Sequence, residues 1–476
     1  MACAVILAGL ALAACGGGSG SGGPGRPSTT TVAHPRSTSG TSTSTTAAAA
    51  HPAAWLTYGG STARDAVDDT SPALGRAPTE AWTSPALDGA VYGEPLVDGG
   101  EVLVATENDT VYALDGADGA VEWSRHLGTP VPASALPCGD ITPTVGITST
   151  MVVDPASGTV FASAALEAGG AVRHEVAALD VAGGALRWER DVDQPGWTAA
   201  AQLQRAALAL DHGEVLVGFG GNDGDCSQYH GWVVGVPESG AGPLLAYEVP
   251  TMREGAIWAP AGVTVDGAGD VIAVTGNGAA VAGQPFDHGD AVIALSPALG
   301  EVGYFAPTDW ARDNAEDEDL ASTAAMVVGA DQLFVVGKEG TAYLLDAAHL
   351  GGIGGQEASL EVCDARGGNA YLAPDAYVAC PLEGTIREVR VGPGPALAAG
   401  WTWRSPTGGS GSPTVAGGVL WTIDAGADLL YGVDPGTGTT VARLPLATAT
   451  PPHFAAPGAA GGLLVVAGSR AVEAFR

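Results

Sequence analysis

Positively charged residues are scarce in this chain. It has 19 Lys and Arg residues against 52 Asp and Glu residues, a net charge of −33, and Lys338 is its only lysine. Such a charge repels phosphate backbones, which argues against a nucleic-acid-binding protein. We attribute the shortage of lysine to a composition bias of the genome, because Ala, Gly, Val and Pro are abundant as well.

Several motifs of metal, haem and hydrolase chemistry are also missing. No CxxC pair occurs, which argues against a four-thiolate zinc site, and no CxxCH occurs that would attach a haem. There is no G-x-S-x-G between a strand and a helix, and helical periodicity is nearly absent. These absences argue against a serine hydrolase.

The start of the chain has an apolar run too short to span a bilayer. Residues 5–14 are apolar and end in Leu12-Ala13-Ala14-Cys15, which resembles the lipobox of bacterial lipoproteins. We therefore expect a signal peptide over residues 1–14 and a diacylglycerol group on Cys15. No Lys or Arg precedes the run, which departs from the usual basic start. The alternative is a buried cysteine without lipid.

Residues 16–50 are almost entirely Gly, Ser, Thr, Pro and Ala. Such a segment buries too little apolar surface to offset the entropy of ordering. We expect residues 15–53 to form a disordered tether that holds residues 54–476 at the cell envelope, outside the cytoplasm.

A repeat of about fifty residues runs through the remaining chain. Its clearest copy is VYALDGADGAVEW at 111–123, in which alternating β-formers surround a turn rich in Gly and Asp. Weaker copies lie at 176–188, 291–300, 341–346 and 430–438. The length suits blades of four strands, so the sequence predicts an all-β propeller.

The units can be counted along the chain. Seven complete ones lie near 91–125, 141–190, 203–249, 258–305, 321–350, 366–405 and 408–445. Residues 453–475 lack a closing strand, which residues 79–83 would supply from the other end of the domain. Sharing a blade between the termini removes the open edge of the ring. We predict eight blades, with seven as the alternative because the unit at 366–405 is weak.

Four cysteines remain once Cys3 leaves with the leader and Cys15 carries lipid. An even number in an exported chain suggests disulfides. Cys363 and Cys380 lie close in sequence on either side of one hairpin or loop, whereas Cys138 and Cys226 flank consecutive units. We expect the pairs Cys363–Cys380 and Cys138–Cys226.

The copy at 111–123 resembles the repeat of pyrroloquinoline-quinone (PQQ) propellers. This group contains quinoprotein alcohol dehydrogenases and the lipoprotein of the outer-membrane barrel-assembly machinery. Further similar segments lie at 138–150, 275–277 and 337–346, and the resemblance covers nearly everything from Trp55 to Arg476. It implies the fold but says little about activity, because the repeated Trp and Asp residues mostly serve packing and turns.

The resemblance implies one candidate cofactor residue. In quinoprotein dehydrogenases the Asn of a Thr-Gly-Asn motif helps hold calcium beside PQQ, and Asn277 matches that position. The family's base lies in a P-x-D-x-W-D segment, of which only Pro307-Thr308-Asp309-Trp310 is present, followed by Ala311. The adjacent cysteines of many of these enzymes are absent.

Other polar segments have two interpretations each. Residues 222–232 could bind calcium, but they lack the spacing of a known calcium loop, so we favour a loop fixed by Cys226. Residues 313–319 are a cation site or, as we favour, a solvated acidic loop. His288 is a candidate lining residue of the central pocket or a structural histidine.

The incomplete catalytic motif favours a non-enzymatic function. We expect an exported, lipid-anchored propeller with a monomeric head and no cofactor, acting as a binding or scaffolding protein for an envelope protein or glycan. The alternative is an oxidoreductase that uses PQQ and calcium to oxidise alcohols or sugars.

Overall fold

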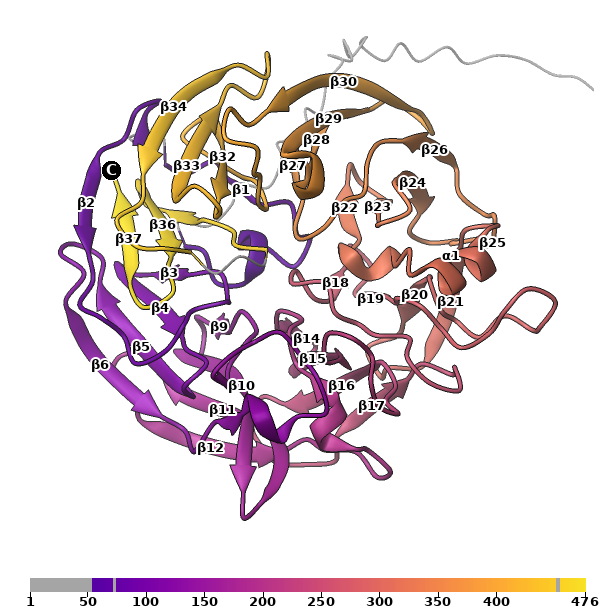
Figure 1. The fold of residues 1–476 in the computed structure, drawn as a ribbon, viewed down its shortest axis with the longest axis horizontal. Coiled ribbons are helices and arrows are strands. Elements are labelled where there is room, and N and C mark those ends of the chain that lie inside the picture. Colours follow the sequence, from indigo (N-terminus) through magenta and orange to yellow (C-terminus); the bar gives the residue numbers. More distant parts are fainter. Residues whose placement is uncertain (1–53, 72–73, 451–453) are drawn as a thin grey trace, which may run out of the picture. The chain divides into compact units, whose positions relative to one another are not determined.

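The computed structural model describes residues 54–71, 74–450 and 454–476. The expected signal peptide, the lipid site at Cys15 and the tether lie outside the described residues. The described part forms an eight-bladed β-propeller, which confirms the predicted fold (Figure 1). Its one α-helix, α1 (Trp310–Glu316), follows the fourth blade. No helix of these ranges is long and apolar enough to cross a membrane.

Seven blades each use one continuous stretch of chain, with the first strand innermost and the last outermost (Figure 1). Within each blade, neighbouring strands are antiparallel. The first blade consists of β3 (Leu96–Asp98), β4 (Glu101–Ala105), β5 (Thr110–Asp115) and β6 (Val121–His126), the second of β9 (Val152–Asp154), β10 (Thr159–Ala168), β11 (Ala171–Asp180) and β12 (Leu186–Asp191), and the third of β14 (Ala209–Asp211), β15 (Glu214–Gly221), β16 (Trp232–Pro237) and β17 (Leu245–Glu248). The fourth consists of β18 (Thr264–Val265), β19 (Val271–Val274), β20 (Val292–Leu295) and β21 (Glu301–Ala306), and the fifth of β22 (Met326–Val328), β23 (Gln332–Val336), β24 (Thr341–Asp346) and β26 (Ala358–Glu361). The sixth consists of β27 (Ala370–Leu372), β28 (Asp375–Cys380), β29 (Thr385–Val391) and β30 (Leu397–Arg404), and the seventh of β31 (Thr414–Ala416), β32 (Val419–Asp424), β33 (Leu429–Val433) and β34 (Thr440–Pro445).

Two-residue strands and 3-10 turns lie in the connections of these blades or in the segment before the first one. β7 (Val131–Pro132) pairs with β8 (Thr144–Val145), β13 (Gln202–Leu203) with β15, and β25 (Gly352–Ile353) with β21. Single 3-10 turns span Tyr58–Gly60, Ala133–Ala135, Ala199–Ala201, Leu320–Ser322 and Pro381–Glu383. β25 precedes the outermost strand of the fifth blade, so that blade closes at β26, beyond the unit at 321–350 that the repeat indicated.

The eighth blade joins both ends of the domain, as predicted. β35 (Gly458–Ala460), β36 (Leu463–Ala467) and β37 (Val472–Phe475) form its inner strands, and β2 (Glu80–Thr83) is its outermost strand. β2 runs antiparallel to β37, with Thr83 opposite Glu473. The weak unit at 366–405 is a complete blade, so the ring has eight blades and not seven.

The Gly and Trp of the repeat meet between neighbouring blades. Gly119 (φ 74°) ends a turn of the first blade, and a Cβ there would lie 2.4 Å from the ring of Trp82 in the eighth. The Trp82 indole N–H donates to Gly116 O over 2.9 Å. Trp123 packs in the same way over Gly184 and donates to Val181 O. The repeat therefore encodes the contact that joins one blade to the next.

Both disulfides expected from the sequence are present. Cys138–Cys226 joins the connection after the first blade to a loop of the third, over a separation of 88 residues. Cys363–Cys380 joins the segment before β27 to the end of β28.

The segment Trp55–Ser71, here called the strap, contacts all eight blades in chain order. Backbone or hydroxyl groups of the strap bond to the innermost strand of each blade or to a residue beside it. The bonds are Trp55 to Val97, Leu56 to Val153, Thr57 to Leu208, Thr62 to Val265, Ala63 to Val327, Asp65 to Tyr371, Ala66 to Val415, and Ser71 to Gly462. Its β1 (Val67–Asp68) also runs parallel to β31. The strap therefore makes one circuit inside the ring.

Arg64 fastens the strap to two blades. Its side chain is 3% exposed, and the guanidinium donates to Val263 O at 2.9 Å, Leu208 O at 3.3 Å and Tyr58 O at 2.9 Å. Burial lowers the pKa of Arg64 to about 10, so the group stays charged at neutral pH. One buried cation thus connects the third and fourth blades through the strap.

Candidate functional site

A pocket of about 480 Å³ opens at the centre of the ring. Its walls come from two repeated places in the blades, namely the connections that enter the innermost strands and the turns between the second and third strands. Its volume lies within the range of ordinary ligand sites. The principal side chains are Asp140, Arg205, Asn222, Asp225, Tyr229, Trp258, Asn277, Asp317, Asp319, Lys338, Arg366 and Phe454.

Asn277 lies in this pocket, on the turn after β19. Its backbone N–H donates to Asp319 Oδ1 and its side-chain Nδ2 donates to Asp317 Oδ1, both over 2.9 Å. The Asn277 Oδ1 atom is buried and accepts no hydrogen bond from the described residues. An unpaired buried oxygen costs free energy, so this atom is available to a donor or a cation brought by a ligand.

Lys338 supplies the positive charge beside these carboxylates. Its ammonium nitrogen lies 2.5 Å from Asp319 Oδ2 and 2.9 Å from Asp317 Oδ1. Burial alone lowers the pKa of Lys338, but the two carboxylates reverse this and raise the pKa above its ordinary value. For Asp319 burial raises the pKa, whereas for Asp317 the contact with Lys338 overcomes burial and lowers it.

Aromatic rings line the same pocket. The Lys338 ammonium lies 5.6 Å from the centre of the Trp258 ring, and the rings of Trp258 and Phe454 are 5.9 Å apart. The Arg205 guanidinium lies 5.3 Å from the centre of the Phe454 ring. Cations over aromatic faces are attracted by the ring quadrupole, which holds both side chains in place.

The other cations of the pocket also have carboxylate partners. Arg366 makes a two-bond contact with Asp364, at 2.7 and 2.8 Å. Arg205 lies 4.0 Å from Asp140. The pocket therefore presents many hydrogen-bonding groups, and each of its cations already contacts a carboxylate of the protein.

The strap adjoins the pocket, and a disulfide fixes one of its walls. Tyr58 of the strap lines a small gap together with Arg205 and Phe454, so the strap lies next to the pocket. Cys226 ties its loop to Cys138, and Tyr229 donates to Asp225 Oδ1 within that loop. Residues 222–232 thus form the disulfide-fixed loop that we favoured, and part of it lines the ligand space.

Two sequence-based site residues lie elsewhere. Asp309 precedes α1, where its side chain is 57% exposed and contacts Arg312, so the Pro-Thr-Asp-Trp segment does not reach Asn277. His288 does not line the pocket; it packs against Phe286 and Tyr304, and its Nε2 lies 3.4 Å from Glu301. Of the two interpretations of His288, the structure supports the structural histidine.

The acidic segment 313–319 differs from the solvated loop that we favoured. Asp319 is 7% exposed and Asp313 is 2% exposed, because both are held by basic side chains, Lys338 and Arg312. In the part of the chain that the structure describes, no group of three His, Cys, Asp or Glu residues could hold a metal ion.

Sequence reasoning did not assign Asp319, Lys338, Trp258 or Phe454 to the central pocket, although Asp319 belongs to the acidic segment 313–319 and Lys338 to the repeat-like segment 337–346. Their shared signal is position within the repeat, because each precedes an innermost strand or follows a second strand. Lys338 also had a compositional signal: the single lysine of the chain lies in its central pocket, which a genomic bias does not explain.

Comparison with known proteins agrees with this fold. Residues 77–229 match the family described as outer membrane protein assembly factor BamB. No curated protein matches the chain. The quinohemoprotein alcohol dehydrogenase from Comamonas testosteroni is similar at a TM-score of 0.67 and 16% identity, over 90% of this chain and 81% of that one.

Two further solved structures are similar to the propeller. A europium-containing methanol dehydrogenase matches at a TM-score of 0.65 and 14% identity, over 87% of this chain and 89% of that one. BamB from Moraxella catarrhalis matches at 0.57 and 14%, over 84% and 98%. The resemblance to PQQ-like propellers is confirmed, and these similarities establish the fold and not the activity.

Proposed function

We propose that this protein is an exported binding protein of the cell envelope, without catalytic activity, whose central pocket binds an uncharged, hydroxyl-rich ligand such as a glycan unit. The disulfides and the propeller fold are consistent with a place outside the cytoplasm. The lipid anchor at Cys15 belongs to the same proposal.

The observation that carries the proposal is the pairing of charges in the pocket. Lys338 contacts both Asp317 and Asp319, and Arg366 contacts Asp364, so these cations are already paired and offer no free positive charge to an anionic ligand. The paired groups still offer hydrogen bonds to hydroxyls, and the aromatic faces of Trp258 and Phe454 suit the C–H face of a sugar ring. The unpaired Asn277 Oδ1 would accept a bond from a hydroxyl.

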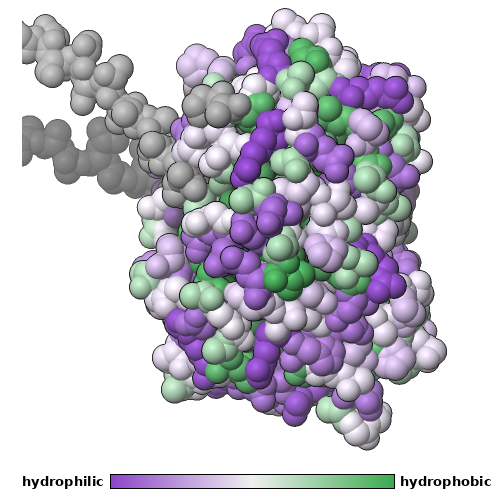
Figure 2. Space-filling model, turned by 90° about the vertical axis from the view of Figure 1, so that its left-hand side faces the viewer, coloured by the Kyte–Doolittle hydropathy of each residue, from purple (hydrophilic) through white to green (hydrophobic). Residues whose placement is uncertain are grey.

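The outer surface offers less support for docking a protein. On the side of the propeller seen in Figure 2, hydrophobic residues lie singly or in small groups among hydrophilic ones. Protein-binding sites more often show a larger continuous apolar patch. This contrast favours the pocket over that side as the binding site.

Calorimetric titration of the purified full chain with glucose and with N-acetylglucosamine tests the proposal. We expect saturable binding of at least one sugar, weakened roughly tenfold or more in Trp258→Ala and in Asn277→Ala, because a ring face or a buried acceptor is lost. Asn108→Ala is the control, since Asn108 occupies the corresponding turn of the first blade and bonds to Asp88 outside the pocket. Binding that resists both pocket variants would contradict the proposal.

A second candidate is a PQQ-dependent oxidoreductase, and the closeness of Asn277 and Asp319 favours it. The pocket fits such a group in part: Asn277 Oδ1 and Asp319 are oxygen donors suited to calcium, and Trp258 offers a face for the quinone ring. Bound PQQ would accept two electrons from the substrate. Asp319 would then hold the substrate proton, while Lys338 and the backbone N–H of Asn277 keep that carboxylate in position.

Titration with PQQ and calcium, followed by a dye-linked alcohol oxidation assay, separates the two candidates. Saturable binding with turnover, both lost in Asn277→Ala, would replace the first proposal by the second. Sugar binding without quinone binding would leave the protein a non-catalytic binder.

A further inference from the structure

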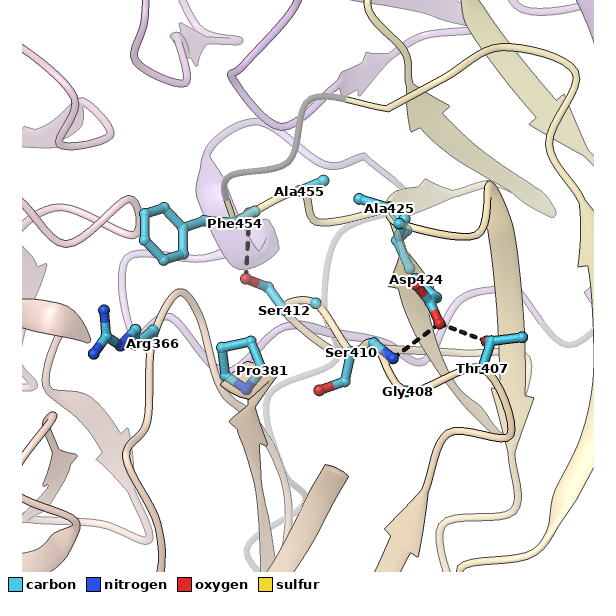
Figure 3. A pocket seen from close by; sticks show the side chains of 14 residues that line it. Arg366, Pro381, Thr407, Gly408, Ser410, Ser412, Asp424, Ala425, Phe454 and Ala455 are labelled. Atoms are coloured by element: carbon cyan, nitrogen blue, oxygen red, sulfur yellow. Dashed lines mark hydrogen bonds between the residues drawn. The ribbon is translucent and has the colours of Figure 1, made fainter. Parts of the chain in front are cut away.

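A second cavity, here called the side chamber, adjoins the central pocket between the sixth and seventh blades. It measures about 340 Å³. Its walls are the connection that enters β31 at residues 407–412, the end of β32 with the turn after it at residues 423–426, and Arg366, Pro381, Phe454 and Ala455 (Figure 3).

The side chamber and the central pocket share two side chains. Arg366 and Phe454 line both cavities. Figure 3 shows these two residues together at one end of the chamber, with Asp424 and Thr407 at the other. A ligand that passes the ring of Phe454 would therefore reach from Trp258 to Asp424.

Asp424 is a fixed acceptor in the wall of the chamber. It is 2% exposed, and its Oδ2 accepts from Ser405 Oγ at 3.2 Å, Thr407 Oγ1 at 2.5 Å and Gly409 N at 3.0 Å. These bonds all go to one oxygen. A Cβ at position 409 would lie 2.2 Å from the other oxygen, so only glycine lets the chain pass this carboxylate.

The serines of the chamber are oriented as acceptors too. Ser410 Oγ donates its hydrogen to Thr385 O at 3.1 Å. Ser412 Oγ donates to Phe454 O at 3.3 Å and already accepts from Gly368 N at 2.8 Å, which leaves Ser410 as the freer acceptor. A hydroxyl that has given away its only hydrogen can only accept from a ligand. The chamber therefore suits a ligand that brings several donors, and the guanidinium of Arg366 at its entrance disfavours a cation.

We propose that the side chamber is a second sugar subsite. The ligand is then a glycan of at least two units, one against Trp258 in the central pocket and the next in the chamber beside Asp424. This inference rests on the proposed binding of a hydroxyl-rich ligand in the central pocket, and it adds the length of that ligand and the direction in which it lies.

The test is a titration of the full chain with two length series, N-acetylglucosamine with its dimer and trimer, and glucose with maltose and maltotriose. In the series that binds, we expect the second unit to raise the affinity about tenfold. Ala425→Phe, which fills the chamber with an apolar ring, and Asp424→Asn should abolish that gain and leave the binding of the single sugar unchanged. Ala117→Phe on an exposed turn of the first blade is the control.

The outcomes distinguish a failure of the second subsite in the side chamber from a failure of sugar binding in the central pocket. Equal affinity for one, two and three units would overturn the second subsite and leave the central pocket as a sugar site. A gain that survives both Ala425→Phe and Asp424→Asn would also overturn it, because the second unit would lie elsewhere. If no sugar of either series binds, both proposals fail.

Discussion

Replacing Arg64 with methionine is expected to lower the free energy of unfolding by about 3–5 kcal/mol, the usual cost of removing one partner from a buried charged contact. Arg64 is 3% exposed and donates to carbonyl oxygens of Val263, Leu208 and Tyr58. Methionine fills much of the same volume but takes the charged donor away from Val263 O and Tyr58 O, whereas Leu208 O keeps its bond from Thr57 Oγ1. Urea unfolding followed by tryptophan fluorescence measures the change.

Two further variants are needed to interpret the result. Arg64→Lys keeps the charge but loses the fork of donors, so it should fall between the wild type and the methionine variant. Arg404→Met removes an exposed arginine that donates to one carbonyl, Glu383 O, and should change stability by less than about 0.5 kcal/mol. If Arg64→Met unfolds at the same urea concentration as Arg404→Met, the strap does not hold the ring together.

Asp109→Asn is expected to stabilise the protein at pH 8 by an amount on the order of 5 kcal/mol and to have no effect below about pH 4. Asp109 is fully buried in a left-handed turn (φ 55°), and among the described residues neither carboxyl oxygen has a hydrogen-bond partner. Burial, with smaller contributions from Glu107 and Asp88, raises its pKa to about 9. Asparagine tolerates the same backbone and never ionises.

The direction follows from proton binding. In the unfolded chain the carboxyl has a pKa of about 3.9, so between about pH 4 and pH 9 the folded protein binds a proton that the unfolded one has released. Folding is then penalised increasingly as pH rises, and the penalty is constant above about pH 9. Thermal unfolding of both proteins from pH 3 to pH 9.5 should show curves that coincide at low pH and separate as pH rises.

Asp428→Asn is the matched control for this experiment. Asp428 occupies the corresponding turn of the seventh blade with φ 51°, but it is only half-buried. Because this side chain is partly open to solvent, its replacement should not reproduce the stabilisation at pH 8 that is expected of Asp109→Asn. A difference between Asp109→Asn and wild type that does not change with pH would mean that Asp109 is ionised in the folded protein.

The fold could be predicted from the sequence because the repeated Gly and Trp residues are the ones that pack neighbouring blades together. Trp82 and Trp123 each contact a glycine of the following blade, so the Gly-x-x-x-Trp pattern records a contact that recurs around the ring. The closing strand was predictable for the same reason, since residues 79–83 resemble the end of a unit without its beginning. β26 was missed because an irregular stretch separates it from β24.

The site was harder to predict because it belongs to no single repeat. Asn277 was found through a motif, yet its partners Asp319 and Lys338 lie 42 and 61 residues further along, on different connections. Asp309 was a better match to the family pattern than Asp319, but it precedes a short helix that points it away from the channel. Which connections face the centre depends on the blade register, and single residues do not reveal it.

The strap also sets the order in which the molecule can be completed. Trp55 bonds to Val97, only a short distance along the chain, whereas Ser71 bonds to Gly462 across a separation of 391 residues. Contacts between such distant residues slow folding, because a long loop must close before they form. A chain that crosses a membrane from its N-terminus would deliver the strap first and its final partners last. Folding of the earliest residues therefore waits for the arrival of the latest.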